Sequence, residues 1–256
     1  MSLNNKIAII TGASSGIGAA TAVLFAKEGA DVAIVARTEA KLNEVAKEIE
    51  ALGRKALVIK TDLSKEAEVD NVVAKTVEHF GKLDILVNNA GFLAEGSLLN
   101  GKALQAYDEV MQVNVRSVIQ LSMLAAPHLV KTKGNIINIS SGAGESVSKN
   151  PNFLPYCVSK AALNHFTRCA ALELAASGVR VNAVSPGPVD NGFLTNNGFG
   201  EEDAAKFKKA ISESVALSYI AQSEEIADVI LFLAGDKAKS VTGSNYAIDN
   251  GYLLKN

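Results

Sequence analysis

Short runs of apolar residues alternate with longer amphipathic stretches along the first part of the chain. The first three runs, at 7–10, 32–35 and 56–59, recur about every 25 residues. Every position in these runs is apolar, which is typical of strands in a parallel sheet whose two faces are both covered by helices. The pattern therefore predicts repeated strand-helix-strand units.

The stretches between these runs each carry one apolar stripe, spaced as on one face of a helix. The stripe of the second stretch consists of Leu42, Val45, Ile49 and Leu52. We expect each helix to end at a glycine, because glycine readily adopts the left-handed conformation that terminates helices. The glycines in these places are Gly29, Gly53 and Gly81.

Further apolar runs bring the expected number of strands to about seven. They lie at 85–87, 136–139, 179–184 and 246–248. Long helical patterns lie near 103–128 and 154–177. The sequence thus predicts an α/β fold. It is a single Rossmann-like, doubly wound domain over 1–256, with a parallel sheet and helices on both faces.

The segment 190–222 breaks this rhythm. It contains clusters of Asn and Gly and a polar helical stretch, and it follows directly on the end of a strand. Ligands of open α/β sheets bind beyond the carboxyl ends of the strands. We therefore interpret this insertion as a lid over a substrate site.

Composition excludes several classes of protein. The 256 residues are 48% apolar and 20% charged, as in a globular protein with a substantial core, and the formal charge of −2 gives no nucleic-acid footprint. Cys157, Cys169 and the three histidines match no ligand pattern, so we expect no metal site. The chain has no apolar run of membrane-spanning length and no room for a signal peptide before the first strand. We expect a cytoplasmic protein with reduced thiols.

A glycine-rich loop follows the first strand, where residues 11–18 read TGASSGIG. Its glycines allow a tight turn and close approach of a pyrophosphate, and the N-terminus of the next helix offers free N–H groups. The spacing is not GxGxxG, and no P-loop lysine follows. We expect a dinucleotide here, and the contacting residues are Gly12, Ser14, Ser15, Gly16, Ile17 and Gly18.

The same loop allows an alternative of another class. Its GASSG sequence matches the nucleophile elbow of serine hydrolases, with Ser14 as the nucleophile. An elbow serine needs an oxyanion loop from an earlier strand, whereas this loop follows the first strand, and no histidine lies in a segment that we can place beside Ser14. A dinucleotide sensor without turnover is a further alternative.

The end of the second strand indicates which dinucleotide binds. An acidic residue there would hold a ribose 2′-hydroxyl and repel a 2′-phosphate. The chain has Ala36 and then Arg37, and a guanidinium on a phosphate contributes about 1.5–3 kcal/mol. We expect NADP(H) in preference to NAD(H), held by Arg37 and Thr38. Alternatively, Arg37 is only an exposed charge at the start of the next helix.

Tyr156 and Lys160 lie one turn apart on one helix face. At about 5 Å, an ammonium would lower the pKa of a phenol by roughly two units and make it a usable acid or base. Ser140 and Ser141 end a preceding strand, where a hydroxyl could polarise a carbonyl group. The three types of side chain together predict proton transfer to or from a carbonyl oxygen.

Motifs along nearly the whole chain resemble the classical short-chain dehydrogenase/reductase family. They are Thr11-Gly12-x-x-x-Gly16-x-Gly18, Asp62-Leu63, Asn88-Asn89-Ala90-Gly91, Asn114, a serine before Tyr156-x-x-x-Lys160, and Pro186-Gly187. The resemblance implies hydride transfer between a nicotinamide and a substrate carbon, which interconverts an alcohol and a carbonyl. It implies that the catalytic residues are Asn114, Ser141, Tyr156 and Lys160.

The resemblance also implies a role for each remaining motif. Asn114 would hold a water that relays protons through Lys160, and Lys160 would also hold the nicotinamide ribose. The other cofactor contacts that it implies are Asp62 and Leu63 at the adenine, Asn89, Ala90 and Gly91 beside the central sheet, and Pro186, Gly187 and Val189 at the carboxamide.

The chain departs from the family pattern in three places. Ser141 lies fifteen residues before Tyr156 instead of thirteen, so we infer two extra residues in the intervening loop and choose Ser141 over Ser140. Asn191 stands where a threonine often contacts the carboxamide. Residues 249–251 read Asp-Asn-Gly instead of Asp-Gly-Gly.

The expected pocket walls are apolar and indicate an apolar substrate. Their residues are Phe92, Leu93, Phe153, Phe193 and Leu194; alternatively, these side chains only pack the lid against the domain. Some segments are similar to insect-type members that act on isoprenoid alcohols such as farnesol, or on steroid-like ketones, and bacterial 3-oxoacyl carrier-protein reductases are similar too. By resemblance we expect a homotetramer or homodimer, formed through the helices near 103–128 and 154–177.

Overall fold

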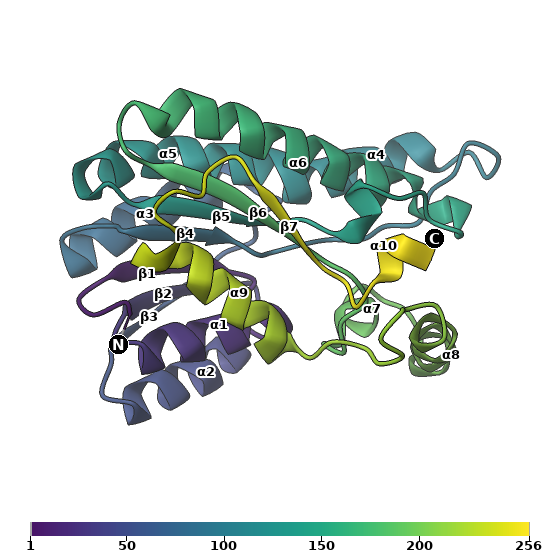
Figure 1. Cartoon of the computed structure of the whole chain (residues 1–256), viewed down its shortest axis with the longest axis horizontal. Helices are drawn as coiled ribbons and strands as arrows, with labels where there is room; N and C mark the ends of the chain where they lie inside the picture. Colours follow the sequence, from purple (N-terminus) through teal and green to yellow (C-terminus); the bar gives the residue numbers. More distant parts are fainter. Residues whose placement is uncertain (1, 256) are drawn as a thin grey trace.

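The computed structural model describes residues 2–255 and contains a parallel sheet of seven strands (Figure 1). The order of the strands is β3-β2-β1-β4-β5-β6-β7. Their bounds are β1 (Ile7–Thr11), β2 (Asp31–Ala36), β3 (Ala56–Lys60), β4 (Ile85–Asn88), β5 (Asn135–Ile139), β6 (Arg180–Pro186) and β7 (Asn245–Ile248). The order reverses between β1 and β4, which is the doubly wound arrangement that we expected.

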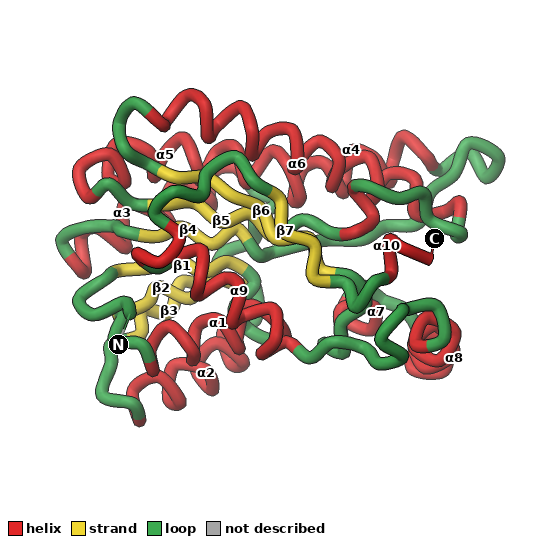
Figure 2. Tube along the Cα trace, in the orientation of Figure 1, coloured by secondary structure: helices red, strands yellow, loops and turns green. Residues whose placement is uncertain are grey.

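Helices cover both faces of this sheet (Figures 1 and 2). The bounds are α1 (Gly16–Lys27), α2 (Glu39–Ala51), α3 (Glu66–Phe80), α4 (Ala103–Met111), α5 (Ser117–Thr132), α6 (Leu154–Ala175), α7 (Phe193–Asn196), α8 (Glu201–Ser212), α9 (Ser223–Ala234) and α10 (Tyr252–Lys255). Apolar side chains of α1, α2 and α9 form one core cluster with the sheet, and those of α3, α5 and α6 form a second. The all-apolar strands are thus buried on both sides.

The long helix expected near 103–128 is interrupted. A π-helical turn, Gln112–Arg116, separates α4 from α5, and Asn114 lies at its centre. Such turns insert one extra residue per turn and often occur at functional sites. The helix-ending glycines behave as expected, with φ of 95° at Gly29, 75° at Gly53 and 83° at Gly81.

The insertion after β6 contains α7 and α8 and lies beside α10, to the right of the sheet in Figure 1. Val189 and Ala221 form a parallel β-bridge at its base, and the amide of Asp190 donates a hydrogen bond of 2.9 Å to the carbonyl of Ala221. The two ends of the insertion, near Val189 and Ala221, therefore lie side by side.

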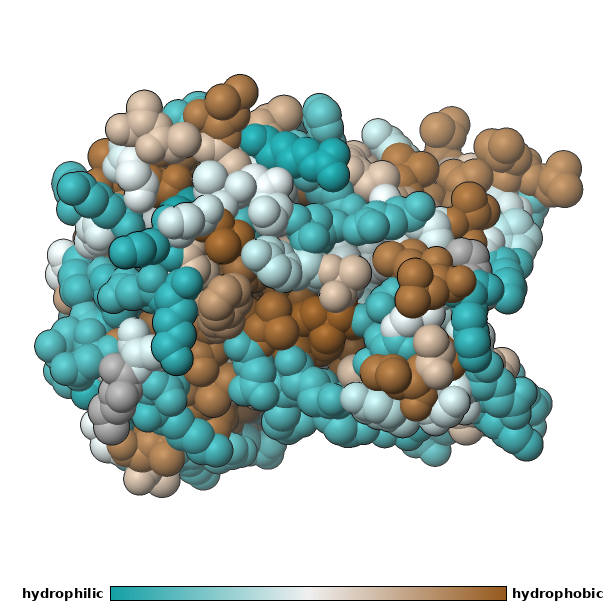
Figure 3. All heavy atoms as spheres, viewed as in Figure 1, coloured by the Kyte–Doolittle hydropathy of each residue, from teal (hydrophilic) through white to brown (hydrophobic). Residues whose placement is uncertain are grey.

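The surface is mostly hydrophilic on the face that Figure 3 shows. Apolar side chains gather at the upper right, where Figure 1 places the loop before α4. Leu98 and Leu99 in this loop are 77% and 101% exposed. Among the described residues, no helix combines the length and the apolar character that crossing a bilayer requires.

Candidate active site

A cavity of about 1260 Å³ opens where the strands end. Ligand pockets usually measure about 300–1,000 Å³, so this one has room for a dinucleotide and a second molecule. Its lining brings together Gly12, Ser14, Ser15, Gly16, Ile17, Arg37, Thr38, Asp62, Leu63, Asn89, Ala90, Gly91, Phe92, Leu93, Ser141, Phe153, Tyr156, Lys160, Pro186, Gly187, Val189, Phe193 and Leu194. Two other expected site residues, Gly18 and Asn114, do not line it.

The glycine loop forms a cradle that only glycine can build. A Cβ atom on Gly18 would lie 2.4 Å from the carbonyl oxygen of Gly12, and one on Gly12 would lie 2.8 Å from the side-chain nitrogen of Asn89. Helix α1 begins at Gly16, and its N-cap residue Ser15 makes no side-chain capping bond. The first N–H groups of α1 therefore lack the usual side-chain cap and can bind an anion. These features fit the pyrophosphate of a dinucleotide.

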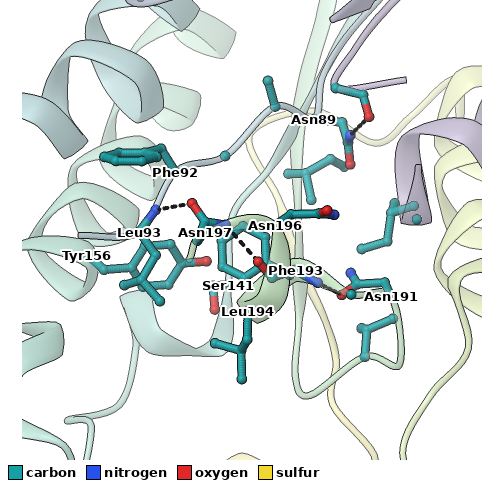
Figure 4. A pocket seen from close by; sticks show the side chains of 18 of the residues that line it. Asn89, Phe92, Leu93, Ser141, Tyr156, Asn191, Phe193, Leu194, Asn196 and Asn197 are labelled. Carbon is teal, nitrogen blue, oxygen red and sulfur yellow. Dashed lines mark hydrogen bonds between the residues drawn. The ribbon is translucent and has the colours of Figure 1, made fainter. Parts of the chain in front are cut away.

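Asn89 fixes the end of β4 against the end of β1. Its side-chain amide donates hydrogen bonds of 2.9 Å to the carbonyl of Thr11 and 3.4 Å to that of Gly12 (Figure 4). In return, the hydroxyl of Thr11 accepts hydrogen bonds of 3.0 Å from the amides of Asn89 and Ala90. These contacts hold the glycine loop at its position in the sheet.

A cationic region lies beyond the end of β2, where Arg37 and Lys41 line the cavity near Asp62. Burial opposes ionisation of Asp62, but hydrogen bonds from Ser64 and the charges of Lys65 and Arg37 outweigh it, so the pKa of Asp62 lies below its usual value. Sequence reasoning missed Lys41, although its place in the first turn of α2, one turn after Arg37, was a usable signal.

Ser141, and not Ser140, lies beside the tyrosine. The Ser141 side chain forms a hydrogen bond with Tyr156, and it accepts a second one of 3.2 Å from the amide of Ala143. Ser140 is buried and donates to the carbonyl of Lys160 at 3.2 Å. The structure thus places together the serine and the tyrosine that we selected despite their unusual spacing.

The electrostatics of Tyr156 and Lys160 differ from our expectation. Burial raises the pKa of Tyr156 to about 12, against a lowering by the bond to Ser141, and burial lowers the pKa of Lys160 to about 8. The expected lowering of the Tyr156 pKa by Lys160 was therefore wrong for this structure. Desolvation dominates for both groups, and the Lys160 Nζ donates to the carbonyl of Ile139 at 2.8 Å while lying 5.6 Å from the centre of the Tyr156 ring.

Asn114 is buried and its side chain is fully engaged. Its Oδ1 accepts a hydrogen bond of 2.8 Å from the amide of Phe92, and its Nδ2 donates to the carbonyl of Phe92 at 2.9 Å and to Ser159 Oγ at 3.0 Å. The side chain thus joins the π-helical turn to the loop after β4 and to α6. The expectation that Asn114 holds a water stays a prediction.

Aromatic side chains surround the tyrosine at the apolar end of the cavity (Figure 4). The rings of Phe193 and Tyr156 have centroids 6.0 Å apart, and Phe153 meets Phe199 edge to face at the same separation. Sequence reasoning missed Tyr252 of α10, which also lines this end. Its position just after the last strand was the available signal.

The lid contacts both walls of the cavity. The side chain of Asn196 donates to Ser15 Oγ at 3.4 Å, and Asn197 accepts a hydrogen bond of 3.0 Å from the amide of Leu93 (Figure 4). Asn191, which stands in place of the usual threonine, accepts from the amide of Phe193 at 3.0 Å and so caps α7.

We examined the described part of the chain for the residues that a serine hydrolase or a metal site would need. Ser14 lines the cavity, but no histidine is among the described residues that line it, so this lining holds no imidazole that could act as its base. No group of three or more His, Cys, Asp or Glu within 2–255 could hold a metal ion.

Comparisons with known proteins agree with this site. The family model described as enoyl-(acyl carrier protein) reductase matches residues 12–253. The 3-oxoacyl-[acyl-carrier-protein] reductase of Thermotoga maritima is 35% identical over 255 residues, which cover 99% of this chain and all of that protein.

Solved structures share the whole fold. A short-chain dehydrogenase/reductase of unknown function from Caenorhabditis elegans, solved with cofactor, has a TM-score of 0.92 at 35% identity. The match covers 99% of this chain and 97% of that chain. A short-chain dehydrogenase from Burkholderia cenocepacia in complex with NADP has a TM-score of 0.90 at 36% identity. The match covers 99% of this chain and 100% of that chain. The chain therefore belongs to the classical short-chain dehydrogenase/reductase family of oxidoreductases.

Proposed function

We propose that the chain is an NADPH-dependent carbonyl reductase with an apolar substrate. The observation that supports this most is the Tyr156 hydroxyl, which lies beside Ser141 at the aromatic end of the cavity with a pKa of about 12. Near neutral pH this hydroxyl keeps its proton and can donate it to a carbonyl oxygen. In the reverse reaction, the oxidation of an alcohol, the same oxygen would take up the proton of the substrate hydroxyl.

Each residue around the tyrosine has a separate role in this reaction. Bound NADPH supplies the hydride. Ser141 donates a hydrogen bond to the carbonyl oxygen and polarises it, and Tyr156 gives its proton to the same oxygen. Lys160, fixed by its bond to the carbonyl of Ile139, holds the nicotinamide ribose.

The choice of NADPH rests on the region after β2. Ala36 leaves no acidic group to repel a 2′-phosphate, and Arg37, Thr38 and Lys41 line the cavity there. The related protein from Burkholderia cenocepacia was solved with NADP, which supports the same preference here. NAD(H) is the less favoured cofactor.

The substrate class follows from the apolar walls. An isoprenoid alcohol or aldehyde of the farnesol type, or a steroid-like ketone, matches their aromatic lining. The second candidate is a 3-oxoacyl group on a carrier protein, because the Thermotoga maritima relative bears that name. We further propose a cytoplasmic homotetramer or homodimer that covers the exposed apolar residues Met123 of α5 and Leu172 of α6.

The test is a turnover screen with the purified protein. NADPH and NADH oxidation is followed against farnesal, steroid ketones and 3-oxoacyl thioesters, in the wild type and in Tyr156→Phe. We expect NADPH oxidation with at least one apolar carbonyl, and in the variant unchanged NADPH binding with turnover lower by orders of magnitude. Undiminished turnover in the variant contradicts the proposal. Tight NADPH binding without turnover would instead identify a sensor, and ester hydrolysis that depends on Ser14 would identify a hydrolase.

A further inference from the structure

The lid carries an ion pair at the edge of the cavity. Lys208 of α8 bonds through its Nζ to Oδ2 of Asp190, at the start of the lid, and both residues line the cavity. Their side chains remain 53% and 42% exposed. A pair this accessible to water contributes little to stability, so the fold alone does not explain why it lies there.

Asp190 directly precedes a residue of the lid that packs on the glycine loop. The next residue, Asn191, packs so closely on this loop that a Cβ on Gly16 would lie 3.1 Å from the Asn191 Cβ. A few residues on, Asn196 bonds to Ser15. The ion pair is therefore adjacent to the place where the start of α1 fits a pyrophosphate.

This place lacks a positive side chain of its own. Residues 11–18 contain no Lys or Arg, and among the described residues the cations that line the cavity are Arg37, Lys41, Lys160 and Lys208. Arg37 and Lys41 lie beyond β2, and Lys160 is bonded to Ile139 beside the tyrosine. Lys208 is thus the lining cation that the lid contributes.

We propose that Lys208 is a ligand of the cofactor diphosphate and exchanges Asp190 for it when the dinucleotide binds. A doubly charged diphosphate attracts the ammonium more strongly than one half-exposed carboxylate does. Without the dinucleotide, Asp190 holds Lys208 at the cavity. When the dinucleotide is bound, Lys208 contacts the diphosphate, and the carboxylate that it has left repels the diphosphate. The exchange ties α8 to the bound cofactor. This inference rests on the proposed dinucleotide function.

The exchange predicts opposite effects for the two partners of the ion pair. Lys208→Gln removes the ligand and is expected to weaken NADPH binding roughly three- to tenfold at low ionic strength, with a smaller effect at high salt. Asp190→Asn frees Lys208 and removes a repulsive charge, so it is expected to tighten NADPH binding. If the ion pair only stabilised the lid, both variants would bind NADPH less tightly.

The experiment is a fluorescence titration of NADPH into wild type, both variants and the control Lys206→Gln. Lys206 lies on the same helix, pairs with Glu202 and does not line the cavity, so the control is expected to bind as the wild type does. Adenosine 2′-monophosphate, which lacks the diphosphate, is expected to bind wild type and Lys208→Gln equally.

Three results would overturn the exchange: unchanged NADPH affinity in Lys208→Gln, weaker binding by Asp190→Asn, or a Lys208→Gln effect confined to the KM of the carbonyl substrate. If the wild type itself bound no dinucleotide, the proposed function would fail as well.

Discussion

The Ser159 hydroxyl donates a hydrogen bond of 2.7 Å to the backbone carbonyl of Tyr156. Ser159 Oγ in turn accepts a hydrogen bond of 3.0 Å from the side-chain amide of Asn114, and Ser159 is completely buried. The first turn of α6, which carries the tyrosine, is therefore fixed to the π-helical turn. Ser159 is a positioning residue in this arrangement, because it acts on Tyr156 only through the backbone.

Replacing Ser159 tests this role. Ser159→Ala leaves a buried donor of Asn114 without its partner, and such a loss costs about 1–3 kcal/mol. We expect kcat to fall by about three- to tenfold while the Kd for NADPH stays unchanged, as measured by steady-state kinetics and by titration. The control is Thr76→Val on α3, which removes another buried hydroxyl bonded to a helix carbonyl. It is expected to lower stability without changing kcat, and an equal loss of kcat in both variants would refute the positioning role.

Arg37 is expected to decide between the two cofactors. Arg37→Ala removes a guanidinium from the region that we assign to the 2′-phosphate, so the Kd for NADPH should rise about tenfold or more while that for NADH changes little. Titration of both dinucleotides measures this. Arg168→Ala, an exposed arginine of α6, serves as the control with no expected effect. Equal weakening of NADPH and NADH by Arg37→Ala would show that Arg37 does not recognise the phosphate.

Lys160 is expected to make the stability depend on pH. Its pKa of about 8 lies below its ordinary value of 10.5. Between these two values the unfolded chain holds a proton that the folded protein has released, so the contribution of Lys160 to the free energy of unfolding rises with pH. Below pH 8 both states are protonated, and the full penalty, on the order of 3 kcal/mol, applies.

Urea denaturation of Lys160→Met and wild type between about pH 7 and pH 10 measures this contribution. The advantage in stability of the variant over the wild type should be largest at the lowest pH and should shrink as the pH rises above 8. Lys75→Met, at an exposed site of α3, is the control for replacing a lysine by methionine outside the cavity. A constant difference for Lys160→Met would mean that the buried ammonium is not penalised.

Gly18 is expected to tolerate no side chain. Gly18→Ala would place a Cβ 2.4 Å from the carbonyl oxygen of Gly12 and 2.5 Å from the Asn89 side chain. Relief of such overpacking costs about 1–3 kcal/mol or more, and it displaces the loop that fits the pyrophosphate. We expect a lower Tm and weaker NADPH binding.

The control is Gly200→Ala, whose new Cβ would meet no atom closer than 3.8 Å. This variant should keep the Tm and the NADPH affinity of the wild type. If Gly18→Ala also kept both, the Cβ clash at Gly18 would not matter.

The sequence alone predicted the sheet and many of the residues that line the cavity. Strands buried on both faces need apolar residues at every position, as in Ile7–Thr11 up to its last residue, so their positions were visible without a structure. The glycine loop and the Tyr156 helix were equally visible, because local spacing determines which residues share a turn.

Features that depend on tertiary packing could not be predicted in the same way. Asn114, at the centre of the π-helical turn, bonds to Phe92 and Ser159, which are distant from it in sequence. The direction of the Tyr156 pKa shift depends on burial, which the distance between two side chains on one helix does not reveal. The position of Lys208 at the cavity could not be predicted for the same reason, since it follows from the fold of the insertion and not from a motif.

The backbone contact between Val189 and Ala221 has an evolutionary consequence. Because the intervening segment starts and finishes at neighbouring points, its length and sequence can change while the seven strands and the adenosine end stay as they are. A recombinant chimera that takes this cassette from a relative should therefore fold on the same scaffold. Exchange of this one segment would change a wall of the cavity and leave the seven-stranded sheet in place.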